Sequence, residues 1–282
     1  MIRLKAYAKL NLSLDVTGKR DDGYHELDGL MQSVSLFDVV TVEKSKKLSV
    51  TADTDVADEK SNSAYRAASA FLKLTKISGA KIHIEKRIPA MSGLGGASAD
   101  AAAALIGLDT LYGAGLGRKA LLEIAQSIGA DVPFALTGGT ARAKGIGEKL
   151  FPVEIKKPMY YAVVKPFAGV STADAFGRYR PGGRIDMDCV QSAVINGDAA
   201  LFGSCAANAL QPAAAEICPE IISAVETLLN AGARKAIITG SGSAVFCAVG
   251  TEEEARELIA RTGSGFELCA ALRPVSRGVE AI

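Results

Sequence analysis

Residues 2–16 of the 282-residue chain, IRLKAYAKLNLSLDV, alternate strictly between apolar and polar side chains. Successive side chains of a β-strand point to opposite faces of the sheet, so this run places its apolar residues on one face and its polar residues on the other. The chain therefore opens with a long half-buried strand, or with two strand segments in line. On spacing alone, the polar face is expected to be solvated.

Helix-like and strand-like segments are mixed along the rest of the chain. Helix patterns cover residues 61–75, 99–113, 118–129, 219–232 and 251–262. Strand patterns cover 30–44, 47–52, 80–88 and 159–166, with a hairpin over 235–249 and a last strand at 266–272. This mixture predicts an α+β fold. A shift in composition near PVEIKKP, residues 152–158, predicts two domains, 1–155 and 156–282.

The composition limits the classes of partner. The formal net charge is +1, which disfavours bulk electrostatic binding to nucleic acid or to an anionic membrane. No run approaches the roughly 18 apolar residues of a membrane span. The five cysteines form no CxxC pair and mostly stand in apolar runs, so we expect reduced thiols in a cytoplasmic protein. With two histidines, the chain offers few ligands for a His/Cys metal site.

A glycine-rich stretch, IPAMSGLGGASADAAAAL at residues 88–105, joins a predicted strand to a predicted helix. The first N–H groups of a helix lack intrahelical partners, and the helix dipole is positive there. Glycines let an anion reach those groups, and Ser92 and Ser98 add hydroxyl donors. We interpret the stretch as an anion-binding loop. The alternative is a tight connection that uses glycine only for its conformational freedom.

Two common phosphate-binding patterns do not occur in this stretch. The pattern GxxxxGK[ST] is found nowhere in the chain. Ser98 stands where GxGxxG requires its third glycine, so the dinucleotide pattern is missing as well. The loop alone therefore leaves the type of anion open.

Three further segments have both a simple and a functional interpretation. Lys9 and Asn11 lie two residues apart on the polar face of the first strand, either solvated or part of a site. Asp131, in IGADVPF, is either a turn carboxylate or a rigidly held one that a nearby lysine keeps ionised. Residues 239–244, TGSGSA, form either a hairpin turn or a second glycine-rich edge that closes over the first loop.

Taken together, these segments resemble the GHMP kinase superfamily of small-molecule kinases. Three motifs occur in the family's order: AKLNLSLDV in the first strand, PAMSGLGGASADAA in the glycine-rich stretch and TGSGSAVF near the end. The resemblance covers most of the chain. It implies a two-domain fold, with an N-terminal ATP-binding domain like domain 2 of ribosomal protein S5 and a C-terminal ferredoxin-like α/β domain.

A longer stretch, AKLNLSLDVTGKRDDGYHEL, is similar to the members whose acceptor is a cytidyl diphosphate methylerythritol. This resemblance implies that the γ-phosphoryl group of ATP passes, with Mg²⁺, to the 2-hydroxyl of the methylerythritol unit, in the non-mevalonate route to isoprenoids. The alternatives are another GHMP kinase, of the homoserine or mevalonate type, and a non-catalytic nucleotide-binding module.

The resemblance also assigns roles to matching positions. It implies that Asp131 is the catalytic base, that Lys9 is its partner, and that Ser98 is a candidate Mg²⁺ ligand. It implies that the ATP phosphates are wrapped by Pro89, Ala90, Met91, Ser92, Gly93, Leu94, Gly95, Gly96, Ala97, Ser98 and Ala99. It implies acceptor contacts from Asn11, Tyr24, His25, Lys144, Thr172, Phe176, Gly240 and Ser241. Within that set, Tyr24 and Phe176 are expected on the two faces of the cytosine, and Lys144 near the phosphates.

The chain departs from the family pattern at two positions of the loop, where Ala97 replaces a glycine and Ala99 replaces a serine. Both residues are small, so close approach to the backbone should survive unless position 97 requires a positive φ. The expected partners are ATP and the small-molecule acceptor, with no nucleic acid and no membrane. The expected state is a monomer or a homodimer.

Overall fold

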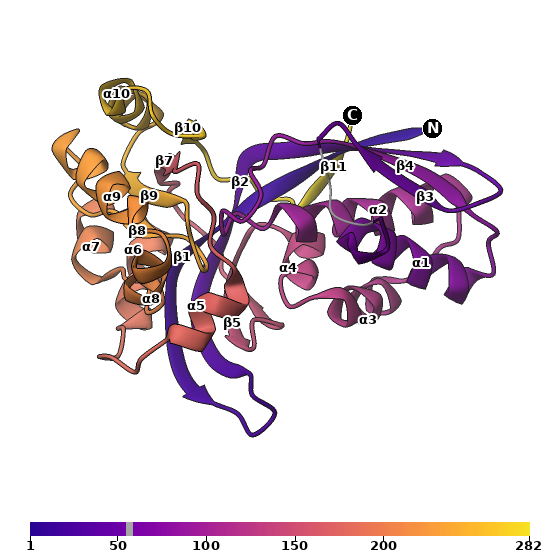
Figure 1. The fold of residues 1–282 in the computed structure, drawn as a ribbon, viewed down its shortest axis with the longest axis horizontal. Helices are drawn as coiled ribbons and strands as arrows, with labels where there is room; N and C mark the ends of the chain where they lie inside the picture. The colour runs from indigo at the N-terminus through magenta and orange to yellow at the C-terminus, as the bar shows by residue number, and fades with distance from the viewer. Residues whose placement is uncertain (55–58) are drawn as a thin grey trace.

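The computed structural model describes residues 1–54 and 59–282. Figure 1 shows an elongated molecule in which β1 and β2 run from one part into the other. The first part contains β1 (Ile2–Lys19), β2 (His25–Lys44), β3 (Ser49–Ala52), η1 (Glu59–Ser61), α1 (Ser63–Thr75), β4 (Ala80–Glu85), α2 (Gly96–Tyr112), α3 (Arg118–Ile128), α4 (Val132–Thr137), β5 (Thr140–Gly145) and β6 (Lys149–Pro152). The second part contains β7 (Tyr160–Lys165), α5 (Thr172–Arg178), α6 (Met187–Asn196), α7 (Ala199–Cys205), α8 (Gln211–Ile217), α9 (Glu220–Asn230), β8 (Ile237–Ile238), β9 (Val245–Val249), α10 (Glu252–Thr262) and β10 (Leu268–Leu272), followed by β11 (Val279–Ala281).

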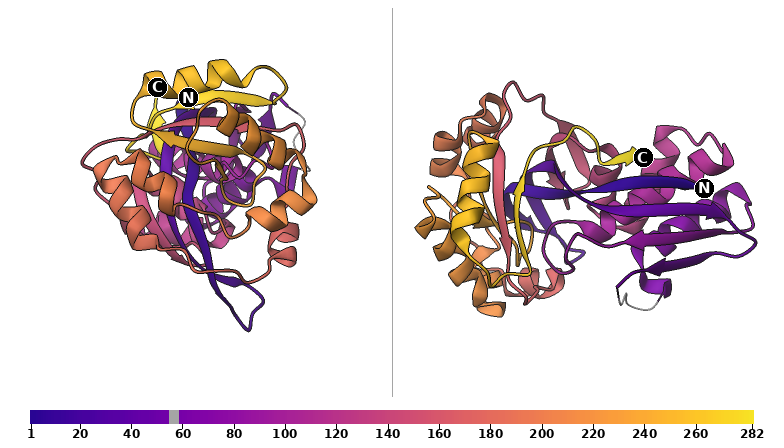
Figure 2. Two further views of the ribbon diagram at one scale, coloured as in Figure 1. Left: turned by 90° about the vertical axis from the view of Figure 1, so that its left-hand side faces the viewer. Right: turned by 90° about the horizontal axis from the view of Figure 1, so that it is seen from above.

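Two sheets organise the described residues. The larger has the order β11-β1-β2-β4-β3, and β5 pairs with both β2 and β6. The smaller has the order β10-β7-β9-β8. α9 and α10 pack on the smaller sheet, and Figure 2 shows them on the side that faces away from the first part. The predicted α+β architecture is confirmed.

The chain ends in the first sheet, where β11 pairs antiparallel with β1 and places Ala281 opposite Leu4. Figure 1 accordingly shows the two termini near each other. The prediction that residues 266–272 form the last strand is therefore wrong, because three residues are too few to show a period-two pattern. The boundary near residue 155 stays a prediction.

From Ala6 to Val16 the first strand is buried on both faces, whereas Arg3 is exposed and Lys5 is partly exposed. Lys9 and Asn11 are each 7% exposed, and Ser13 and Asp15 are buried as well. The second part covers this polar face, since Ser13 Oγ donates to the carbonyl oxygen of Ala207 at 2.6 Å. The expectation of a solvated polar face is therefore wrong from Lys9 to Asp15, although Arg3 at the start of the strand is exposed. Alternation shows which residues share a face, whereas what covers that face depends on a segment almost 200 residues away.

Helix α2 lies directly on the larger sheet. A Cβ atom at Gly107 would stand 2.7 Å from Val42 Cγ2 and 2.8 Å from Leu4 Cδ1, so only glycine allows this approach. The buried alanines 101–104 let α1 and α4 pack closely on the same helix. The core therefore fixes the N-terminal end of α2, where the glycine-rich stretch enters the helix.

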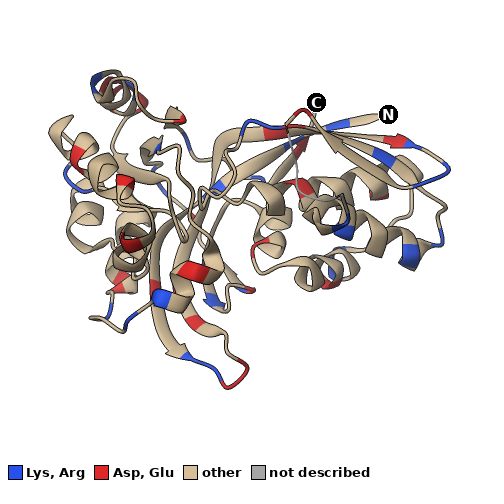
Figure 3. Ribbon diagram, viewed as in Figure 1, with Lys and Arg blue, Asp and Glu red and all other residues tan. Residues whose placement is uncertain are grey.

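The surface and the thiols agree with the composition. Figure 3 shows basic and acidic residues mixed over both parts of the ribbon. All five cysteines are free thiols. Among the described residues, no helix combines the length and the apolar character that crossing a bilayer would require.

Candidate active site

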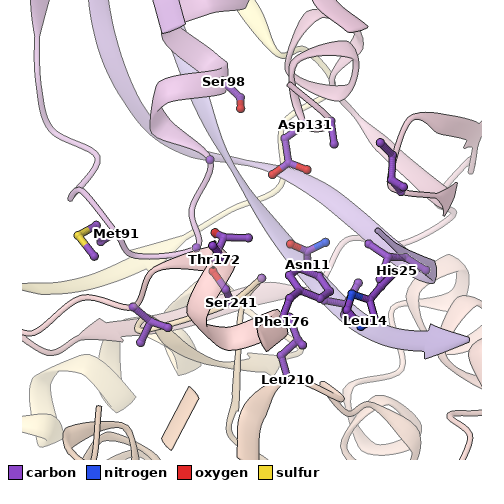
Figure 4. A pocket seen from close by; sticks show the side chains of 18 of the residues that line it. Asn11, Leu14, His25, Met91, Ser98, Asp131, Thr172, Phe176, Leu210 and Ser241 are labelled. Carbon is purple, nitrogen blue, oxygen red and sulfur yellow. Dashed lines mark hydrogen bonds between the residues drawn. The ribbon is translucent and has the colours of Figure 1, made fainter. Parts of the chain in front are cut away.

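A cavity of about 1340 Å³ is lined by both parts of the molecule. Its walls come from β1, the β1–β2 turn, the glycine-rich stretch, the start of α4, α5 and the turn after β8. Figure 4 shows side chains from these elements pointing into the cavity. Of the residues assigned by resemblance, all but Leu94, Ala99 and Lys144 line it.

Lys9 and Asp131 lie beside each other in the wall of this cavity. Lys9 Nζ lies 3.4 Å from Asp131 Oδ2 and also donates to Asn11 Oδ1. The Lys9 side chain is 9% exposed, whereas that of Asp131 is 37% exposed. Figure 4 shows the side chains of Asn11 and Asp131 directed toward one another. The ammonium group is thus held in a dry setting, while the carboxylate stays open to the cavity.

The chain turns sharply at Asp131 for local reasons. Gly129 ends α3, and Pro133 stands in the first turn of α4, where its missing N–H costs nothing. Asp131 itself is the N-cap residue of α4, yet its side chain makes no capping hydrogen bond. A carboxylate that serves only the turn would be expected to cap the helix. The geometry therefore favours the functional interpretation of Asp131.

The glycine-rich stretch forms a tight loop before α2. Met91, Gly93 and Gly95 have φ values of 51°, 76° and 77°, which lie in the left-handed region. Helix α2 begins at Gly96, three residues before the predicted start, so Ala97 lies in the first helical turn. Position 97 is helical and needs no positive φ, so the backbone conformation seen here accommodates alanine. Ser98, on the same turn, also points into the cavity in Figure 4.

The turn after β8 packs against this loop. The backbone N–H of Ala244 donates to the carbonyl oxygen of Ser92 at 3.0 Å. A Cβ atom at Gly93 would stand 2.0 Å from the carbonyl oxygen of Thr239. Thr239 Oγ1 also accepts a hydrogen bond from the backbone N–H of Asn11 at 2.8 Å. The hairpin and the closing edge are therefore one structure, and both interpretations of TGSGSA are correct.

Aromatic rings occupy the far end of the cavity. His25 stacks on Phe176 with ring centroids 5.1 Å apart and planes inclined by 25°. Tyr24 lines the same region and is 60% exposed. Nearby, Thr172 Oγ1 and Ser241 Oγ lie 3.0 Å apart and join α5 to the turn after β8. The structure therefore gathers the residues predicted to contact the acceptor, apart from Lys144, and it places His25 rather than Tyr24 against Phe176.

Lys144 lies apart from this group. It is an exposed residue of β5, paired with Asp28 on β2 and Lys149 on β6. Its neighbours Ala143 and Gly145 are buried on the opposite side of the strand. A role for Lys144 at the substrate phosphates stays a prediction.

A second lysine at the cavity, Lys86, forms a cluster with Asp38 and Asp100 that was not predicted. Lys86 Nζ donates to Asp38 and, at 2.7 Å, to Asp100 Oδ2. Asp38 also accepts from the backbone N–H groups of Arg87 and Ile88, which lead into the glycine-rich stretch. Burial raises the pKa of Asp100 to about 7, although Lys86 opposes the shift. Asp100 Oδ1 has no hydrogen-bond partner among the described residues.

The cluster left only a partial signal in the sequence. Asp38 interrupts the apolar run LFDVV, and Asp100 interrupts the alanine run. A charge inside an apolar run marks a paired buried group. The partner is 48 residues from Asp38, however, and only the fold brings the two together.

Comparison with known families identifies the family to which these motifs belong. The family model for the GHMP kinases N terminal domain matches residues 62–139, and the model for GHMP kinases C terminal matches residues 190–267. A 4-diphosphocytidyl-2-C-methyl-D-erythritol kinase of Pelotomaculum thermopropionicum is 40% identical over 268 residues, which cover 93% of each chain. The enzyme of that name from Symbiobacterium thermophilum is 35% identical and covers 98% of this chain and 97% of its own.

Solved structures agree with these matches. A crystal structure of 4-(cytidine 5'-diphospho)-2C-methyl-D-erythritol kinase superimposes with a TM-score of 0.83 at 33% identity, covering 97% of this chain and 99% of that one. The homoserine kinase of Cytophaga hutchinsonii superimposes with a TM-score of 0.77 at 19% identity, covering 100% and 97%, which shows the fold alone. The chain belongs to the GHMP kinases.

Proposed function

We propose that this protein transfers the γ-phosphoryl group of ATP to the 2-hydroxyl of 4-(cytidine 5'-diphospho)-2-C-methyl-D-erythritol, in the non-mevalonate route to isoprenoids. The observation that most supports this proposal is one shared cavity. Lys9 and Asp131 stand beside the glycine-rich loop, and the rings of Tyr24, His25 and Phe176 stand at the other end. Relatives that carry the name of this activity, and that are similar over nearly the whole chain, add support.

Phosphoryl transfer passes through a loose transition state, so catalysis depends mainly on positioning and on charge neutralisation. The free N–H groups at the start of α2 and the helix dipole supply donors for the ATP phosphates. Lys9 supplies a fixed positive charge beside Asp131. These groups stabilise the negative charge on the transferring group without reorganising.

Asp131 is the residue placed to take the proton of the acceptor. The acceptor oxygen forms a bond to the γ-phosphorus, the bond from that phosphorus to the β,γ-bridging oxygen breaks, and ADP leaves. The hydroxyl proton passes to the Asp131 carboxylate. A carboxylate is a weak base toward an alcohol, which suffices when the proton leaves late, after bonding to phosphorus has begun. Orientation of the hydroxyl by Asp131 is the alternative role.

The cavity also suits a magnesium ion held mainly by the nucleotide. Mg²⁺ in kinases is bound by few protein groups together with substrate phosphates and water. No cluster of three acidic, histidine or cysteine ligands occurs within residues 1–54 and 59–282, which fits such a site. The Ser98 hydroxyl enters the cavity and would hold the ion together with the ATP phosphates. When bound, it neutralises phosphate charge.

The direct test is an ATP-consumption assay with a panel of alcohols. The panel contains the cytidyl diphosphate methylerythritol, homoserine and mevalonate. We expect turnover with the first and background rates with the other two. Turnover on homoserine or mevalonate alone would replace the proposed acceptor. Binding of ATP without turnover on any acceptor would favour the non-catalytic nucleotide-binding module.

A second assay addresses the cytosine end. If Tyr24 contacts the base, Tyr24→Ala should raise KM for the cytidyl substrate about tenfold while KM for ATP stays within about twofold, since one exposed stacking contact is at stake. An equal rise in both constants would speak against this placement. A cytoplasmic location, the use of Mg²⁺ and the state of a monomer or homodimer stay predictions.

A further inference from the structure

Two aromatic residues lie at the C-terminal end of α5, Phe176 in its last turn and Tyr179 as its C-cap residue. Phe176 and Tyr179 are three residues apart, so their side chains lie on the same face of the last turn. Both rings line the cavity. Tyr179 is absent from the roles that the family resemblance assigns.

The ring of His25 is packed by both aromatic residues. Phe176 covers its face, at 5.1 Å between ring centroids. Tyr179 meets it edge-on, at 5.8 Å and an angle of 85°. The hydroxyl of Tyr179 donates to the carbonyl oxygen of Val16 on β1, at 3.4 Å, so the tyrosine is tied to the strand beside the histidine. A stacked contact fixes the plane of a ring, and an edge-on contact limits its rotation within that plane.

The same packing affects the protonation of His25. Burial among these rings lowers its pKa from the usual 6.5, and the positive charge of Lys19, opposite it on β1, lowers it further. Neutral imidazole has one donor and one acceptor nitrogen, which suits hydrogen bonding to a nucleobase edge. Lys19 and Tyr179 are the titratable groups that face this ring from β1 and α5.

We propose that Tyr179 is a positioning residue that fixes the orientation of the His25 ring for recognition of the acceptor's base. The proposal rests on the proposed function, because it assumes that the base binds at the aromatic end of the cavity. Tyr179 acts through His25, at the far end of the cavity from the Lys9–Asp131 pair. Its loss should therefore weaken acceptor binding and leave the chemistry of transfer in place.

The test compares two variants at one position with a control. Tyr179→Leu removes the ring, whereas Tyr179→Phe keeps it and loses only the hydroxyl. Tyr160→Leu is the control, since Tyr160 lies on β7 outside the cavity. Steady-state kinetics with each substrate gives kcat and both KM values. Nuclear magnetic resonance titration of the histidine rings, on the protein without ligands, reports the His25 environment directly, with His83 as the internal reference.

For Tyr179→Leu we expect KM for the cytidyl substrate to rise about five- to tenfold, because one edge-on aromatic contact is lost and the His25 ring is less well ordered. We expect KM for ATP and kcat to stay within about twofold, and the His25 midpoint to move up toward 6.5 while His83 is unchanged. Tyr179→Phe should behave nearly as the unmodified protein, and Tyr160→Leu should change none of these values.

An unchanged His25 titration in Tyr179→Leu would overturn the proposal, and so would an equal rise in KM for both substrates. The two proposals fail separately. Absence of turnover on the cytidyl substrate by the unmodified enzyme would defeat the proposed function alone. The histidine titration, which needs no substrate, would still decide whether Tyr179 positions His25.

Discussion

Two lysines reach neighbouring glycines of the glycine-rich loop, and their surroundings differ. A Cβ atom at Gly95 would stand 2.9 Å from Lys9 Cγ, and one at Gly96 would stand 3.4 Å from Lys86 Nζ. Lys86 bonds two carboxylates whose side chains are 0% and 6% exposed. Lys9 has one carboxylate, Asp131, at 3.4 Å and 37% exposed.

We interpret this difference as that between a cation with a structural role, Lys86, and one that we propose acts on the substrates, Lys9. The partners of Lys86 are buried and already bonded, so exchanging them would leave charges unpaired in a dry interior. The partner of Lys9 faces the cavity and is partly exposed, so its charge can be hydrated if Lys9 is lost. Lys86 therefore holds the segment before the loop, whereas Lys9 presents its charge to the cavity.

The largest expected effect comes from removing each cation in turn. Lys86→Met leaves Asp38 and Asp100 without a counter-charge, and we expect the free energy of unfolding to fall by about 3–5 kcal/mol, as when a buried ion pair loses one partner. Lys9→Met should cost less stability, because Asp131 can be hydrated, while activity is lost. Denaturant unfolding of both variants measures this difference.

Lys119→Met is the control for that experiment, since Lys119 is an exposed residue of α3. Its free energy of unfolding should stay within about 0.5 kcal/mol of that of the unmodified protein, as is usual for surface substitutions. If Lys9→Met and Lys86→Met lost equal stability, the distinction between a structural and a reactive lysine would be wrong.

The second prediction concerns the carboxylate that Lys9 accompanies. Asp131→Asn keeps the shape of the side chain and removes the base, so kcat should fall at least about 10²-fold with little change in either KM. Activity near that of the unmodified enzyme would end the assignment of Asp131 as the base. Thermal unfolding is the accompanying measurement, because a partly exposed carboxylate should contribute little to stability.

The two lysines also mark how far the sequence could predict this site. Lys9, Asn11 and Asp131 stand in motifs, and the family resemblance placed them together before the fold was known. Lys86 and its carboxylates were missed, since the three residues come from β2, the segment after β4 and α2. Their pairing depends on a crossing of elements that local pattern does not contain.

The same limit applies to the fold. Residues 2–16 predicted a strand correctly, because alternation is a local property. The burial of Asp15 and Ser13 could not be predicted, since the cover comes from the second part of the chain. The early start of α2 at Gly96 was missed because glycine is a poor helix former, whereas close packing against Ile88 favours glycine there.

Neighbouring glycines give a finer test of the comparison. Gly95 has φ 77°, and a methyl group there would press on the Lys9 side chain, so Gly95→Ala should lower kcat about tenfold by displacing the ammonium group. Gly96 is helical, and a methyl group there would meet Ile88 at 3.0 Å. Gly96→Ala should therefore affect stability more than kcat. Equal losses of kcat in both would show that loop geometry in general, rather than Lys9, determines the rate.

The smallest expected effect is a change in the pH dependence of stability. The pKa of Asp100 in the folded protein, about 7, lies above its usual value of 3.8. Between these values the folded state keeps a proton that the unfolded chain has released. The contribution of Asp100 to the free energy of unfolding is therefore fully present below about pH 4 and is lost as the pH rises through 7.

Asp100→Asn removes this titration. The variant should gain stability relative to the unmodified protein between about pH 4 and 7 and keep the gain at pH 8. We expect about 1 kcal/mol, because the amide no longer pairs with Lys86 and only part of the burial cost is recovered. Unfolding midpoints at pH 5 and pH 8 measure the effect. Asp38→Asn is the matched comparison and should destabilise at both values, since Asp38 also holds the N–H groups of Arg87 and Ile88. If Asp100→Asn lowered stability at pH 8, this prediction would be wrong. The Asp100 carboxylate would then be a charge that pairs with Lys86 and stabilises the fold, as Asp38 is.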